Sequence, residues 1–115
     1  MKIIPLLTLL AFCGYAHTEK LSDQPAQAAS QIERWVPIGT PLTQAQRVME
    51  QHHFTCSVMT NSTFGDLKGI DFLYCDYREA NSQLVPVVYQ VWQVALVLAD
   101  GKISSVRVST GLKGL

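Results

Sequence analysis

The sequence predicts an α+β fold. One or two N-terminal helices would pack on an antiparallel sheet of about three to four strands that ends in a β-hairpin. Three observations support this. Asp100-Gly101 stands between two apolar, β-branched runs, which is the strongest short-range hairpin signal. Residues 43–53 repeat apolar positions at helical spacing. Residues 54–59 and 70–77 alternate as half-buried strands do.

The length and composition of the chain indicate one small domain with a modest core, which we place at residues 31–115. Lys and Arg number 9, as do Asp and Glu, so the formal net charge is zero. This balance argues against nucleic acid as a partner, because such binding needs a basic surface. It argues equally against electrostatic docking on anionic lipid.

Residues 1–16 read as an export signal, with Lys2 before an apolar stretch that is too short to span a bilayer. Two cleavage sites compete. Gly14-Tyr15-Ala16 suits ordinary cleavage before residue 17, whereas Leu10-Ala11-Phe12-Cys13 resembles the bacterial lipoprotein signal, in which the cysteine is acylated. An uncleaved apolar helix is a third alternative. The first two place the protein in the periplasm or at the outer membrane, and any membrane contact is through lipid on Cys13.

The N-terminal half follows with a tether and two helices. Residues 17–30 are polar and rich in Ala, Gln and Ser, as flexible tethers are. A short helix over residues 26–35 would place Ile32 and Trp35 on one face. The clearer helix has Thr43 as its N-cap and Gln46 in capping-box position, and it ends near residue 52 or 53.

The C-terminal half supplies the strands. We expect strands at residues 54–59 and 70–77, loops at 60–69 and 78–83, and Pro86 at a strand edge or start. The final hairpin spans residues 89–109. Its two-residue turn, of type I′, would put Leu98 opposite Ile103 and Ala95 opposite Val106.

Cys56 and Cys75 are the cysteines of the mature domain. An even pair in an exported chain indicates a disulfide. Two alternatives remain: a nucleophilic Cys56 with His53 as its base, and a zinc site that adds His52 and His53 to the two cysteines. The two histidines also suit an ordinary solvated helix end. We predict no catalytic residues, metal or cofactor.

Candidate contact residues lie in two places. Trp92 alternates with apolar residues and should be a core aromatic, so Trp35 beside the tether is the better exposed contact. The remaining candidates are Phe64, Asp66 and Lys68, in the loop expected over residues 60–69.

The layout resembles the BamE/SmpA family of the outer-membrane β-barrel assembly machinery. The resemblance covers residues 26–109 and depends on Gly39 and Pro41 before the second helix, that helix, the strand around Tyr74, and the final hairpin. The cysteine pair and the long central loop depart from the family. The resemblance implies a fold and an envelope compartment, and it does not imply membership of the assembly machine.

Two functions are consistent with these features. The first is a non-catalytic envelope protein that supports interaction or assembly with another envelope protein. The second is a disulfide-stabilised inhibitor that inserts residues 60–69 into an extracytoplasmic hydrolase, such as a lysozyme or protease.

Overall fold

The computed structural model describes residues 20–81 and 88–114. The elements follow in the order α2 (Pro25–Trp35), α3 (Leu42–Gln51), β1 (Thr55–Phe64), β2 (Leu67–Asn81), β3 (Val88–Ala99) and β4 (Lys102–Gly114). The four strands form one antiparallel sheet in the order β1-β2-β3-β4. The predicted α+β fold is confirmed.

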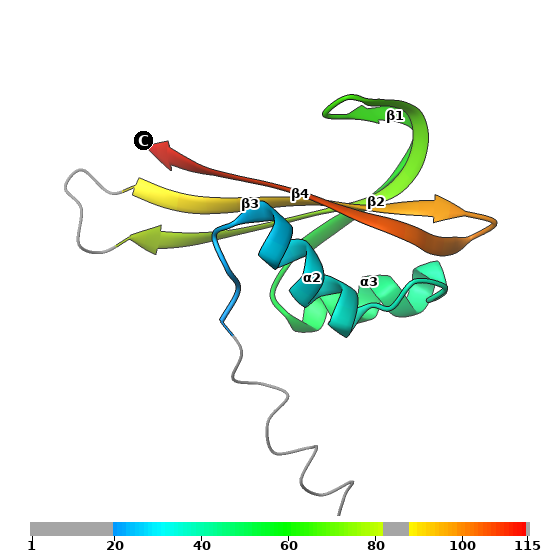
Figure 1. Ribbon diagram of the computed structural model, residues 1–115, viewed down its shortest axis with the longest axis horizontal. Coiled ribbons are helices and arrows are strands. Elements are labelled where there is room, and N and C mark those ends of the chain that lie inside the picture. Colours follow the sequence, from blue (N-terminus) through cyan, green and yellow to red (C-terminus); the bar gives the residue numbers. More distant parts are fainter. Residues whose placement is uncertain (1–19, 82–87, 115) are drawn as a thin grey trace, which may run out of the picture.

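The helices cover one face of the sheet. Figure 1 shows α2 and α3 on the same side, while the end of the β1–β2 hairpin curls away toward the other side. The core lies between the helices and the sheet, where apolar stripes of both helices meet alternate residues of the strands. Its fully buried members include Ala28, Ile32, Ala45, Met49, Leu73, Cys75, Val94 and Leu96.

The α2 helix belongs to the domain. It begins at Pro25, a residue suited to a first helical position because its missing N–H has no partner there anyway. Ala28 is fully buried, and the indole N–H of Trp92 donates to the Ser22 carbonyl oxygen at 2.6 Å. The tether predicted over residues 17–30 is therefore wrong from Ser22 onward. Trp92, 2% exposed, is the core aromatic predicted for it.

The α3 helix starts earlier than its sequence suggests. Pro41 is the N-cap, and no side chain caps the helix, so the predicted Thr43 cap and its capping box are wrong. The C-terminus is as predicted, with His52 as the C-cap. His53 follows with φ 71°, and its N–H and that of Phe54 donate to the carbonyls of Glu50 and Met49. This is a Schellman ending with histidine where glycine is usual.

The final hairpin has the predicted turn and a shifted register. Both turn residues have positive φ, 55° at Asp100 and 75° at Gly101, as a type I′ turn requires. Leu98 faces Ile103 as expected, but Ala95 faces Arg107 and not Val106. The pairing shifts by one residue after Leu98, because Ser104 forms a β-bulge and its hydroxyl donates to the Val97 carbonyl.

The central loop is a hairpin. β1 runs to Phe64 and β2 starts at Leu67, so only Gly65 and Asp66 turn the chain where a loop over residues 60–69 was predicted. The pairing of β1 with β2 has two register shifts, one between Met59 and Ser62 and one between Ser62 and Phe64, and Asn61 has φ 48°. The second predicted loop is also wrong up to Asn81, since β2 keeps its pairing with β3 to that residue. Pro86 lies outside the described residues.

Candidate functional site

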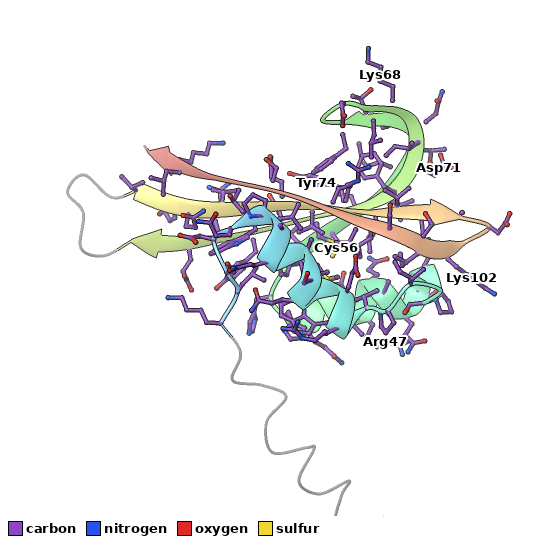
Figure 2. The ribbon with its side chains drawn as sticks, viewed as in Figure 1. Arg47, Cys56, Lys68, Asp71, Tyr74 and Lys102 are labelled. Atoms are coloured by element: carbon purple, nitrogen blue, oxygen red, sulfur yellow. The ribbon has the colours of Figure 1, made fainter. Side chains whose placement is uncertain are left out.

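The face of the sheet opposite the helices is the candidate functional site, and we call it the open face. Strand residues alternate between the two faces, so the neighbours of the core residues point here. Cross-strand pairing joins Met59 to Phe72, Tyr74 to Ala95, and Ala95 to Arg107. Figure 2 shows Tyr74 on the opposite side of the sheet from Cys56.

The curled end of the β1–β2 hairpin covers one part of the open face. The Phe64 ring meets the Phe72 ring edge to face, with 5.9 Å between centroids, and Phe72 is only 2% exposed. The curl begins at the bulge, where the Asp71 carboxylate accepts a 2.9 Å hydrogen bond from the Asn61 N–H. Lys68 and Asp71 lie on this projecting end in Figure 2.

A groove runs from beneath the hairpin toward β4. The part under the hairpin has a volume of about 460 Å³, and an adjoining part toward β4 has about 360 Å³. Tyr74, Gln93 and Ser109 line both parts, and the Gln93 amide donates to the Tyr74 hydroxyl at 3.1 Å. Met59, 37% exposed, adds an accessible apolar side chain. The groove thus combines aromatic walls with a few polar groups, a combination typical of binding sites.

Positive charge gathers at the β4 end of the open face. The Arg78 guanidinium lies over the Tyr89 ring, 5.8 Å from its centroid. Arg78 and Lys113 line the groove there together with Asp76. Arg107, on the same face, is exposed. This end is therefore suited to a ligand that brings carboxylates.

The predicted disulfide partners face each other across β1 and β2, between the sheet and the helices. Cys56 pairs directly with Cys75; both are free thiols in the structure, and their sulfur atoms lie 2.9 Å apart. Cys75 is fully buried and Cys56 is half-buried. The register brings together the two residues that a disulfide needs. The bond itself stays a prediction.

The two thiols differ in acidity because a hydrogen bond joins them and they are buried to different extents. A hydrogen bond from Cys75 lowers the pKa of Cys56 below its ordinary value, against the opposing effects of burial and of the Glu50 and Asp76 carboxylates. The same hydrogen bond, with burial, raises the pKa of Cys75. In the reduced protein Cys56 is therefore the thiolate that reacts first.

The two histidines do not form a centre with the cysteines. The His52 ring stacks on Trp35 with 3.7 Å between centroids, and His53 is exposed after α3. Within residues 20–81 and 88–114, no three histidine, cysteine, aspartate or glutamate side chains come together as a metal site. Trp35 and His52 line a separate cavity of about 310 Å³ with Phe54, Tyr77 and Trp92.

The predicted contact residues fall on opposite sides of the molecule. Phe64, Asp66 and Lys68 share the projecting β1–β2 hairpin, with Phe64 half-buried and the two charged residues exposed. Trp35 is half-buried on the helix side, against His52 and Phe54, so the structure does not join it to the other three. Cys13 lies outside the described residues.

Sequence reasoning missed Met59, Tyr74 and Gln93. The sequence contained one signal for this site. Where one face of an antiparallel sheet is exposed, its strands usually place polar residues on that face, but Phe72 and Tyr74 place aromatic residues on this face of β2, opposite the apolar core residues.

Comparisons with known proteins give no relative. The sequence matches no protein-family model and no curated protein, and the fold matches no solved structure. Among the described residues, no helix has the length and apolar character needed to cross a membrane.

Proposed function

We propose that this protein is a non-catalytic, exported envelope protein that acts as an interaction or assembly-support module, with the open face as its contact surface. The observation that carries the proposal is the groove, about 460 Å³ beneath the hairpin, on a sheet face that neither helix covers. Grooves with apolar walls and a few convergent polar groups are where ligands and partner side chains bind.

The compartment in this proposal comes from the sequence. The apolar leader over residues 1–16 supports export, with cleavage before residue 17 or acylation of Cys13. The layout resemblance to the BamE/SmpA family supports the envelope as the place of action, and the partner would be another envelope protein.

Two neighbouring residues of β1 provide a matched test. Met59 lies on the open face and is 37% exposed; Val58 lies on the other face and is 50% exposed. In a photocrosslinking and affinity-capture experiment on host envelopes, the captured partner should be lost with Met59→Lys and kept with Val58→Lys. Both variants add the same charge at an exposed site, so melting temperatures should agree. Equal capture by both variants would contradict the open face as the contact surface.

A second function has an observation of its own. The β1–β2 hairpin projects from the sheet (Figure 1), and Asp66 and Lys68 are exposed at its end. Such a hairpin supports the alternative proposal, an inhibitor that inserts this end into the cleft of an extracytoplasmic lysozyme or protease.

Enzyme assays separate the two proposals. The purified domain would be titrated against lysozyme and against periplasmic proteases, together with a variant carrying Asp66→Ala and Lys68→Ala. Stoichiometric inhibition that the variant loses would establish the inhibitor. Full hydrolase activity at a tenfold excess of the domain would refute the inhibitor proposal, and the interaction module would be the remaining proposal.

A further inference from the structure

The outer edge of β4 is the feature from which we argue. β4 is the last strand of the sheet. The α2 helix packs against β4, and along the outer edge of the strand another described segment makes backbone hydrogen bonds only at its beginning. There the N–H groups of Gly39 and Leu42 donate to the carbonyls of Ile103 and Gly101, at 2.7 and 3.1 Å, and the Ile103 N–H donates to Thr40 at 2.9 Å. Beyond Ile103, no other segment of the described chain makes a backbone hydrogen bond to this edge.

The part of β4 beyond Ile103, whose edge has no backbone partner in the described chain, is regular. From Val97 opposite Ser105 to Val88 opposite Gly114, the pairing with β3 continues without a register shift. The other edge strand, β1, differs, because two register shifts and the positive φ of Asn61 bend it. Bulges and bends of this kind blunt an edge, whereas a straight edge presents a row of N–H and C=O groups that can pair with another chain.

The side chains of β4 divide by face. Arg107 and Lys113 point to the open face, with the small residues Ser109 and Gly111 between them. A Cβ added to Gly111 would meet no atom within 4 Å, so this stretch has room. On the other face, Leu112 is 67% exposed, more than any other large hydrophobic residue described.

We propose that residues 105–113 of β4 bind an extended, amphipathic segment of a protein partner by strand addition. The segment carries two acidic residues six positions apart, which face Arg107 and Lys113, and an apolar residue on its other side that covers Leu112. Cross-strand neighbours stand about 5 Å apart, close enough for each carboxylate to meet its cation. The inference rests on the proposed interaction function and specifies the chemistry of the partner.

A second copy of this chain is a poor occupant of the edge. β4 contains Lys102, Arg107 and Lys113 and no acidic residue. Pairing two such strands would place cations of both copies along one short ladder, and like charges across strands destabilise it. The same cations that oppose self-association select an acidic partner.

Synthetic peptides test the proposal on the full domain. The probe is a fluorescein-labelled peptide of nine alternating threonine and valine positions, with glutamates at two threonine positions six apart. One control has lysines in place of the glutamates, and a second has N-methyl groups on alternate backbone amides. Fluorescence anisotropy should give binding of the glutamate peptide roughly tenfold tighter than of the lysine peptide. The N-methylated peptide should not bind, and the amide resonances of residues 105–113 should shift.

Charge reversal supplies the matched variants. Arg107→Glu with Lys113→Glu should reverse the preference toward the lysine peptide. Lys102→Glu is the control, because Lys102 lies at the start of β4, where residues 39–42 already cover the edge. This variant should still bind the glutamate peptide about tenfold more tightly than the lysine peptide. Equal binding of both peptides to wild type, an unchanged preference in the double variant, or amide shifts confined to residues outside β4 would each overturn the proposal.

The capture experiment separates this inference from the proposed function. A partner that Met59→Lys loses and the Arg107→Glu, Lys113→Glu variant keeps would sustain the open-face function and refute edge binding. A glutamate-peptide preference in a protein that captures no envelope partner would refute the proposed function while edge binding stands.

Discussion

Oxidation of Cys56 and Cys75 should stabilise the domain by about 3 kcal/mol at 25 °C. The two residues are 19 positions apart, and closing a loop of this size removes about 11 cal/mol/K of chain entropy from the unfolded state in the loop-closure account. The folded state needs little rearrangement to form the bond, because the two cysteines are already paired across β1 and β2 with their sulfur atoms 2.9 Å apart.

Serine variants separate the contribution of the disulfide to the free energy of unfolding from the contribution of burying each cysteine side chain. In reducing buffer, Cys56→Ser should cost less than about 1 kcal/mol, since its side chain is half-buried. Cys75→Ser should cost about 1–3 kcal/mol, because it places a hydroxyl in the core beside Val94. In oxidising buffer each variant should lose a further 3 kcal/mol or so relative to wild type. The double variant should lose the bond only once, and because the two side chains are in contact, its departure from the sum of the two burial costs plus one bond measures the coupling between the two positions.

Urea denaturation of wild type and the three variants, with and without dithiothreitol, measures all of these values. A thiol count under denaturing conditions reports the bond itself. Identical denaturation midpoints for oxidised and reduced wild type would refute the entropic argument. Two free thiols in protein isolated from an oxidising compartment would refute the disulfide.

Three further predictions concern single residues. Gly101→Val should lower the free energy of unfolding by about 1–3 kcal/mol through backbone strain at φ 75°, whereas Gly111→Val, in the same hairpin without positive φ, should change the thermal midpoint little. His53→Gly should raise the free energy of unfolding by about 0.5–1 kcal/mol, because glycine adopts φ 71° without strain; a lower midpoint in urea would count against the Schellman ending. In the reduced protein, iodoacetamide should modify Cys56 at a lower pH than ordinary cysteine, since its pKa is lowered, and Cys75 only after unfolding; peptide mass spectrometry would reveal the opposite order.

Local chemistry explains which parts of the fold were predictable. Asp100-Gly101 specifies its turn within two residues, and the apolar spacing of residues 45–49 specifies a helix within two turns. The bulge at Ser104 was not predictable, because it depends on how β4 meets β3 and on a hydrogen bond to Val97. It moved the expected partner of Ala95 by one residue.

The central hairpin shows why the candidate site was only partly predictable. Asn61, Gly65 and Gly69 are turn formers that suit a loop and a bulged hairpin equally well, and pairing with β2 decides between them. Phe64 was selected as an exposed loop residue, yet it covers Phe72. Strand alternation predicts that Tyr74 and Phe72 lie on the same face of the sheet. It does not predict which of the two faces the helices leave open, and Tyr74 was overlooked for this reason.

The hydrogen bonds that join Gly39 and Thr40 to Ile103 constrain the order in which the chain can fold. They connect the link between the helices to the last hairpin, and α2 itself packs against β4. A chain that emerges from a ribosome or a translocation channel with its N-terminus first therefore offers α2 no surface until nearly all of the sequence has followed. Contacts over such a long sequence separation slow folding. The α2 helix therefore docks late, and until then its apolar stripe around Ile32 is exposed to chaperones and proteases.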